Sequence, residues 1–130
     1  MMVQQMVVVG SGVMGRGIAY VAAASGFDVT LVDVEQQLLA SAQQKLETIA
    51  DKGVSRGKMT TEEVGQLFDR LRYATDLEEA VKEADLVIEA VPERLEIKRM
   101  VFETLDRHAP AECVFATNTS TMSPTEIASF

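Results

Sequence analysis

The chain has 130 residues, of which 20 are acidic and 12 basic, with 47% hydrophobic residues and a formal net charge of −8 at pH 7. This composition indicates one globular domain and excludes a disordered or fibrous protein, and the acidic balance argues against nucleic acid or an anionic membrane as a partner. A single Cys excludes an internal disulfide, and neither a signal peptide nor an apolar run of the roughly 20 residues that span a bilayer is found. We therefore expect a soluble protein in the reducing cytoplasm.

The first third of the chain predicts one βαβ unit. A β-branched run, Met6–Val9, reads as a buried strand that ends at Gly10. An Ala-rich helix is expected over Met14–Ser25, and Gly26 stands where a helix commonly stops. A second β-branched strand follows over Asp28–Asp33.

Two helices are predicted between this second strand and the third. The first, Glu35–Lys52, is broken by Gly53 and Gly57, and the second is opened by the capping box of Thr60 and Glu63. The apolar residues of the first helix fall on one face: Leu38, Leu39, Ala42, Leu46, Ile49 and Ala50. Because a plain crossover needs only one helix, we expect a protruding helical hairpin, and its spacing alone leaves open whether it has a purpose or is decorative.

The rest of the chain continues the alternation of strands and helices. The expected elements are a strand at Arg72–Thr75, a short helix begun by Asp76, a strand at Leu86–Val91, a helix at Leu95–Arg107 and a strand at Cys113–Thr117. This order predicts an α/β fold: a Rossmann-type, doubly wound parallel sheet with a helical hairpin inserted after the second strand.

The glycines of the first turn predict a dinucleotide site. Gly10, Gly12 and Gly15 form a G-x-G-x-x-G motif directly after a strand and at the opening of a helix. In this motif the first glycine permits a tight turn, the second lets the backbone approach a pyrophosphate, and the third lets helix and strand pack closely. A glycine turn without a ligand is the alternative, which the βαβ context disfavours.

Asp33 predicts which dinucleotide is bound. It ends the second strand, 18 residues after Gly15, where a carboxylate accepts hydrogen bonds from the adenosine ribose and repels a 2′-phosphate. Residues 34–37 contain no Arg that would neutralise such a phosphate. The sequence therefore predicts NAD rather than NADP, the alternative being a solvated carboxylate at a strand end.

Three motifs carry a resemblance to a known family. They are GSGVMGRGIA at residues 10–19, EAVPE at residues 89–93 and NTST at residues 118–121. With these motifs in this order, the sequence resembles the 3-hydroxyacyl-CoA dehydrogenases, most closely the bacterial 3-hydroxybutyryl-CoA dehydrogenases, over essentially all 130 residues. The resemblance implies the NAD-binding half of an enzyme of fatty-acid and butanoate metabolism. That enzyme interconverts (S)-3-hydroxyacyl-CoA and 3-oxoacyl-CoA by hydride transfer.

The resemblance also implies roles for single residues. Ser120 matches the active-site serine that hydrogen-bonds the substrate oxygen at C3, and Arg56, Lys98 and Ser120 match positions that contact the acyl-CoA. The implied cofactor-binding residues are Gly10, Ser11, Gly12, Val13, Met14, Gly15, Asp33, Ala90, Val91, Glu93, Lys98, Asn118 and Ser120. From the residues alone, Ser120 reads as a turn residue. Arg56, flanked by Lys52 and Lys58, suits the phosphates of CoA but reads equally well as part of a solvated loop.

The family's general base, a histidine about twenty residues beyond the serine in the family pattern, has no match here. His108 reads instead as an exposed residue at a helix end, Cys113 as a small core residue, and no spacing suggests a metal site. A helix start at Ser123–Glu126 lies just before the end of the chain. We therefore expect residues 1–130 to be an NAD-binding domain whose helical C-terminal substrate and dimerisation domain is absent, so that this chain alone is inactive.

Two other interpretations stay open. The β-hydroxyacid dehydrogenases share a similar glycine turn, although the hairpin and the motif at residues 89–93 count against them. A non-catalytic NAD-binding or structural relative of the same family is the other. Retention of NAD without turnover in a full-length protein would point to it.

Overall fold

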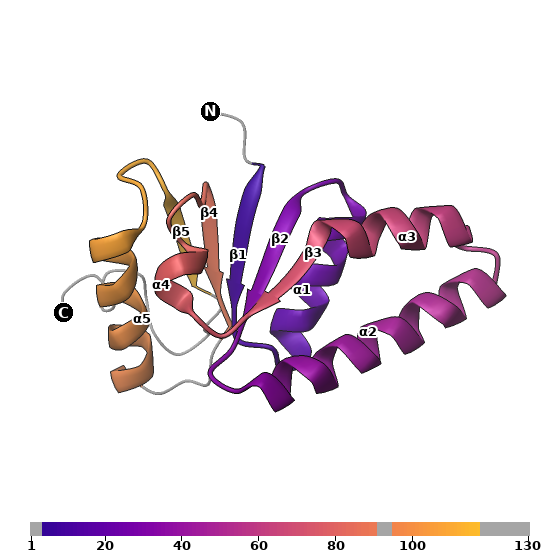
Figure 1. Ribbon diagram of the computed structural model, residues 1–130, viewed down its shortest axis with the longest axis horizontal. Coiled ribbons are helices and arrows are strands. Elements are labelled where there is room, and N and C mark those ends of the chain that lie inside the picture. The colour runs from indigo at the N-terminus through magenta and orange to yellow at the C-terminus, as the bar shows by residue number, and fades with distance from the viewer. Residues whose placement is uncertain (1–3, 91–94, 118–130) are drawn as a thin grey trace.

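The computed structural model describes residues 4–90 and 95–117, the side chains of residues 95–98 and 117 excepted. A parallel sheet runs through it in the order β3-β2-β1-β4-β5 (Figure 1). Its strands are β1 (Gln5–Val9), β2 (Asp28–Val32), β3 (Leu71–Ala74), β4 (Leu86–Glu89) and β5 (Val114–Thr117). The predicted parallel α/β sheet is confirmed. β4 ends two residues before the predicted Val91, which lies outside the described residues.

Helices cover both faces of the sheet, as expected of a doubly wound fold (Figure 1). They are α1 (Val13–Ala24), α2 (Gln36–Ser55), α3 (Thr61–Arg70), α4 (Leu77–Ala80) and α5 (Leu95–His108). Alternate residues of β1 point to opposite faces: Met6 and Val8 pack in the core beneath α1, and Val7 and Val9 in the core beneath α5. This two-sided burial explains why β1 is apolar without interruption.

Gly26 ends α1 as predicted. Its φ of 105° lies in the left-handed region, and its N–H donates to the Ala23 carbonyl at 3.2 Å. The N–H of Phe27 donates to the Ala22 carbonyl at 3.1 Å, so the last carbonyls of the helix are satisfied. The chain is thereby turned back into β2.

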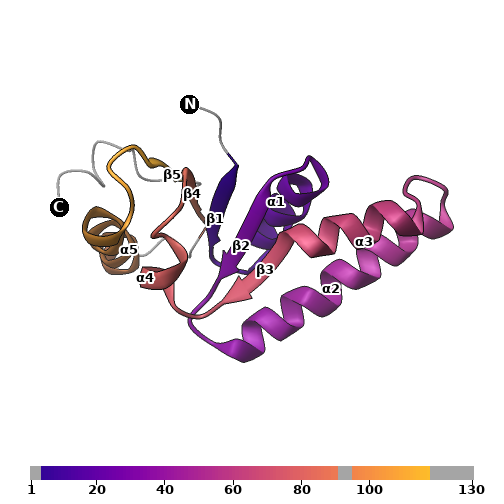
Figure 2. The same ribbon diagram turned by 45° about the horizontal axis from the view of Figure 1, so that its top comes forward.

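The predicted helical hairpin is present as α2 and α3, which project past β3 (Figure 2). Gly53, however, does not break the first helix, which runs on to Ser55 and ends where Gly57 adopts a φ of 72°. The Gly53 carbonyl accepts from the N–H groups of Lys58 and Met59 at 2.9 and 3.3 Å, which closes the turn after the helix. A Cβ at this position would make only ordinary contact with Met59, at 3.8 Å.

One face of α2 is buried, and it is narrower than its sequence suggested. Leu39, Ala42, Leu46 and Ala50 are buried, whereas Leu38 and Ile49 are 44% and 48% exposed at the margins of this stripe. The hairpin is fixed to the domain through α1. There the Tyr20 hydroxyl lies 3.4 Å from the Met59 sulfur, and Arg70 Nε donates to the Ala23 carbonyl at 2.8 Å.

The capping predictions for Thr60 and Asp76 are confirmed, whereas the helix start predicted at Ser123–Glu126 lies outside the described residues. The Thr60 hydroxyl accepts from the Glu63 N–H at 3.1 Å, and the Glu63 carboxylate accepts from the Thr60 N–H at 2.9 Å. The Asp76 carboxylate caps α4 through the Glu79 N–H. In the described part of the chain, no helix is long and apolar enough to cross a membrane.

Candidate functional site

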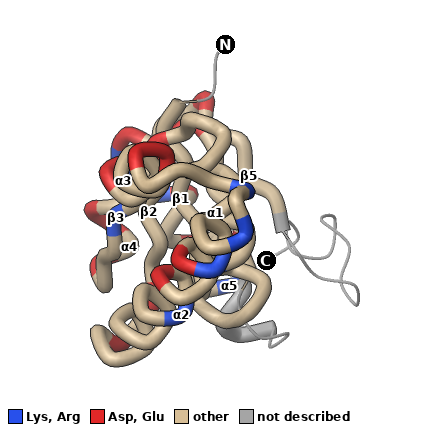
Figure 3. The backbone as a smooth tube through the Cα atoms, turned by 90° about the vertical axis from the view of Figure 1, so that its right-hand side faces the viewer, with Lys and Arg blue, Asp and Glu red and all other residues tan. Residues whose placement is uncertain are grey.

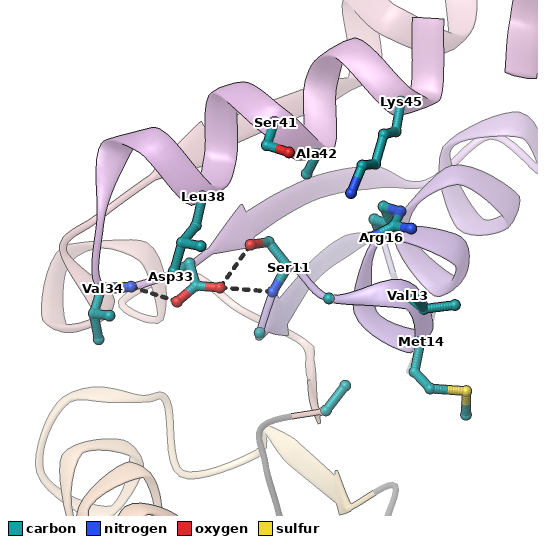
Figure 4. A pocket seen from close by; sticks show the side chains of 13 residues that line it. Ser11, Val13, Met14, Arg16, Asp33, Val34, Leu38, Ser41, Ala42 and Lys45 are labelled. Carbon is teal, nitrogen blue, oxygen red and sulfur yellow. Dashed lines mark hydrogen bonds between the residues drawn. The ribbon is translucent and has the colours of Figure 1, made fainter. Parts of the chain in front are cut away.

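A cleft of about 700 Å³ opens at the carboxyl ends of β1 and β2, between the glycine turn and α2 (Figure 4). The strand order reverses next to β1, and α1 and α5, which follow β1 and β4 in the chain, lie on opposite faces of the sheet. Open α/β sheets bind their ligands at such a switch point. The fold therefore places a ligand site where the glycine motif lies.

The glycine turn is built on close backbone approach. Gly10 has a φ of 104°, and its N–H donates to the Val32 carbonyl at 2.8 Å, which ties the turn to β2. A Cβ on Gly15 would stand 1.7 Å from the Gly10 carbonyl oxygen, so only glycine permits this contact between α1 and the turn. The Ala90 Cβ also packs against this position, 3.6 Å from where a Cβ on Gly15 would be.

Gly12 begins α1 and faces open space. Nothing lies within 4 Å of where its Cβ would be, no side chain caps the helix, and the first turn contains no acidic residue. The N–H groups of the first turn have no partner within a helix, and the helix dipole adds positive potential there. An anion fits this position, and Val13 and Met14, 73% and 58% exposed, stand beside it.

Asp33 is held in one orientation at the end of β2. Its Oδ2 accepts from both the N–H and the hydroxyl of Ser11, at 2.9 and 2.6 Å, and its Oδ1 accepts from the N–H of Val34 at 2.7 Å (Figure 4). A carboxylate has about four acceptor positions, so Asp33 retains capacity for a ligand hydroxyl. Ser11 is buried, and it links the carboxylate to the glycine turn.

A second hollow, of about 420 Å³, lies on the other side of Asp33 toward α4 and α5. Its lining includes Val9, Val34 and Met100 together with two acidic residues, Asp76 and Glu78. A flat, uncharged ring is the group best suited to these walls. The negative charges around this hollow disfavour a phosphate inside it.

The structure brings most of the predicted glycine-turn residues together. Gly10, Ser11, Gly12, Val13, Met14, Asp33 and Ala90 all line the cleft, and Gly15 supports it from beneath. Val91, Glu93, Asn118 and Ser120 lie outside the described residues, as does the side chain of Lys98 in α5. Their predicted roles therefore stay predictions.

Arg56 lies apart from the cleft, at the tip of the hairpin. It caps α2, and with Lys52 and Lys58 it forms an exposed basic group at that tip. Figure 3 views the molecule from the side of the hairpin, where basic and acidic segments lie near one another. The placement leaves both earlier interpretations open, a phosphate contact or a solvated loop.

Sequence reasoning missed Arg16 and Lys45, which line the cleft at the end away from Asp33. Arg16 stands in the quoted glycine motif, but the motif's spacing gives no role to that position. Lys45 lies in the middle of α2, and no sequence pattern connects it with the glycine turn. Only the packing of α2 beside α1 places them in one cleft.

His108 and Cys113 lie away from this cleft. His108 was predicted to be exposed, but it is partly buried. Its side chain is 34% exposed, and its Nε2 lies 3.8 Å from the Glu78 carboxylate. Burial raises the pKa of the Cys113 thiol, which packs against the core beneath α5. A raised pKa disfavours the reactive thiolate, in line with a packing residue.

Known proteins show which family shares this arrangement. The profile of the family described as "3-hydroxyacyl-CoA dehydrogenase, NAD binding domain" matches residues 5–130. The chain belongs to this family.

Similar family members include a 3-hydroxyadipyl-CoA dehydrogenase of Escherichia coli K12, 43% identical over 97% of this chain and 26% of that protein. A probable 3-hydroxybutyryl-CoA dehydrogenase of Bacillus subtilis is 39% identical over 98% of this chain and 44% of that protein. The crystal structure of a 3-hydroxybutyryl-CoA dehydrogenase from E. coli K12 superposes with a TM-score of 0.94, at 42% identity over 98% of this chain and 27% of that one.

These comparisons confirm the predicted family and its cofactor. The cofactor of the family domain is NAD, and the glycine turn with Asp33 fits it, because Gly12 leaves its approach open and the carboxylate retains acceptor capacity. The chain spans less than half the length of the two curated relatives named above.

Proposed function

We propose that this chain binds NAD across the carboxyl ends of its strands, as the cofactor half of an enzyme that interconverts 3-hydroxyacyl-CoA and 3-oxoacyl-CoA. The observation that carries the proposal is the Asp33 carboxylate, fixed by Ser11 and Val34 beside the glycine turn. The names of the relatives support the substrate class, since each contains a 3-hydroxyacyl-CoA activity.

The adenosine diphosphate half of NAD has matching surfaces among the described residues. The N–H groups at the start of α1 bind the pyrophosphate, and Asp33 accepts from the adenosine ribose hydroxyls. The hollow beside Val34 and Met100 receives the adenine ring. Asp33 repels a 2′-phosphate, and the carboxylates of Asp76 and Glu78 add to that repulsion, so NAD is selected over NADP.

NAD, when bound, supplies the hydride acceptor at C4 of its nicotinamide. In the proposal Glu93, Lys98 and Asn118 lie along the nicotinamide half, and Ser120 holds the substrate oxygen at C3 by a hydrogen bond. Arg56, at the hairpin tip, contacts the phosphates of CoA, which gives the hairpin a purpose.

The proposal includes a helical C-terminal domain that follows residues 1–130 in the working enzyme. Such a domain provides the histidine general base and the acyl pocket, and it forms a homodimer. The partial coverage of the relatives supports this division. The proposal also places the protein in the cytoplasm and predicts that residues 1–130 bind cofactor but turn over substrate poorly.

Binding to the NADH-loaded chain tests the substrate class. Acetoacetyl-CoA and free acetoacetate are titrated into the chain, into Arg56→Gln and into Arg72→Gln, a matched charge change at an exposed position on β3. We expect the thioester to bind and the free acid not to, with about five- to tenfold weaker thioester binding in Arg56→Gln alone. Equal binding of the free acid and the thioester would instead support a β-hydroxyacid dehydrogenase.

A further inference from the structure

Two cations meet at one end of the cofactor cleft. Arg16 comes from α1 and Lys45 from α2, and both line the end of the cleft away from Asp33 (Figure 4). Asp33 stands at the opposite end of the same cleft, beyond Ser11. The cleft therefore has a positive and a negative end.

Neither cation has a partner in the described part of the chain. Within residues 4–90 and 95–117, Arg16 and Lys45 make no hydrogen bond or ion pair through their side chains. Two like charges repel each other, and here both line one cleft although the chain carries a net charge of −8 with 20 acidic residues. An anion that enters the cleft removes this repulsion.

The backbone brings Arg16 close to the glycine turn. Its N–H donates to the Gly12 carbonyl at 2.9 Å, so it follows the start of α1 by one helical turn. Tyr20, four residues on, contacts Met59 of the hairpin, which shows that this side of α1 faces the hairpin. Lys45 belongs to the hairpin and lines the cleft from the other wall.

We propose that Arg16 and Lys45 form a phosphate-binding pair that holds the diphosphate of an adenine nucleotide against the start of α1. Backbone N–H groups contact the diphosphate from the glycine turn, the Arg16 side chain contacts it from α1, and the Lys45 side chain contacts it from α2. The inference rests on the proposed function and assigns two further specificity residues to it. Because NAD and CoA both contain an adenosine diphosphate, the test separates these two sources.

The experiment compares the chain with Arg16→Gln, Lys45→Gln and the double variant, and with Arg72→Gln as the charge-matched control. Each protein is titrated with NADH, ADP, adenosine and dephospho-CoA, after its melting curve has shown that it is folded. We expect each single variant to weaken NADH and ADP binding about five- to tenfold and the double variant more, with adenosine and the control unchanged. Rising salt should weaken NADH binding less steeply in the double variant than in the unmodified chain.

Each outcome decides the inference. Weaker binding of dephospho-CoA with unchanged NADH binding keeps the phosphate pair and assigns it to the acyl-CoA. Unchanged affinity for NADH, ADP and dephospho-CoA in the double variant overturns it. If the unmodified chain binds no NADH, the proposed function fails, and the phosphate pair is then tested with inorganic pyrophosphate in melting curves. Thermal stabilisation of the unmodified chain that is lost in the double variant supports the pair. Equal stabilisation of both proteins, or none, overturns it.

Discussion

The glycine turn and the helical hairpin are specified in different ways. At the turn single atoms decide, because a Cβ on Gly15 would stand 1.7 Å from the Gly10 carbonyl oxygen and Asp33 is fixed by three hydrogen bonds. The hairpin is held by a capping box, a narrow apolar stripe and a few contacts with α1. The comparison teaches that binding depends on a few exact positions, while the hairpin tolerates change at most of its surface.

The same substitution in the two regions should have opposite effects, and this is the largest difference we expect. Gly15→Ala should destabilise the fold by about 3 kcal/mol or more and abolish NADH binding, because the new methyl group displaces the turn. Gly65→Ala, in the open middle of α3, should stabilise it by about 1 kcal/mol through helix propensity. Urea denaturation measures both, and equal stability of the two variants would contradict the comparison.

The next largest difference is expected in cofactor affinity when one negative charge is removed from each region. Asp33→Asn should weaken NADH binding about 10- to 100-fold, because the amide loses charge-assisted hydrogen bonds to the ribose, and it should narrow the preference for NADH over NADPH. Asp51→Asn makes the same change at an exposed position on α2 and should leave both affinities unchanged. Fluorescence titration of NADH and NADPH gives the two ratios. An unchanged preference for NADH over NADPH in Asp33→Asn would contradict the role of Asp33 in selecting the cofactor.

A change at the cap of α3, which lines neither the cleft nor the second hollow, should alter stability alone. Thr60→Ala removes the cap of α3 and should lower the free energy of unfolding by about 1 kcal/mol. Thr61→Ala, one residue on at the exposed first position of the helix, should change it by a few tenths. NADH affinity should be the same in both. A loss of affinity in Thr60→Ala would show that the hairpin and the turn are coupled more tightly than the contacts indicate.

The smallest effect is a pH dependence at the base of the hairpin. Burial, and secondarily the nearby Glu47, raises the pKa of Tyr73 on β3 to about 12, from 10.0. The folded chain therefore holds this proton more tightly than the unfolded chain. Its contribution to stability is complete below about pH 10 and is lost as the pH rises toward about 12.

In Tyr73→Phe the free energy of unfolding should fall less between about pH 10 and pH 12 than in the unmodified chain, as measured by denaturation curves at each pH. The substitution should also be neutral or slightly stabilising near pH 7, since the Tyr73 hydroxyl is buried without a hydrogen-bond partner in the described structure. Parallel pH curves for the two proteins would contradict the assignment.

The sequence predicted the turn residue by residue and the hairpin only in outline. Gly10, Gly12 and Gly15 obey a spacing that backbone geometry imposes, and Asp33 follows from the length of one βαβ unit. Gly53 was misjudged as a helix breaker because a glycine only weakens a helix, and α2 continues through it to Ser55.

No local sequence pattern predicted the basic end of the cleft. Arg16 and Lys45 stand 29 positions apart in the sequence and share the cleft only because α2 packs beside α1. The second hollow likewise combines residues of β1, α4 and α5. Tertiary packing decides such neighbours, and a single sequence records it only through family resemblance.

The most direct measurement is a titration of the unmodified chain with NADH and, in parallel, NADPH, followed by nicotinamide fluorescence. The account predicts saturable binding of NADH and binding of NADPH weaker by at least about tenfold, since a 2′-phosphate would approach the fixed carboxylate of Asp33. Equal affinity for the two, or a preference for NADPH, would contradict the assignment of Asp33 and the choice of cofactor with it.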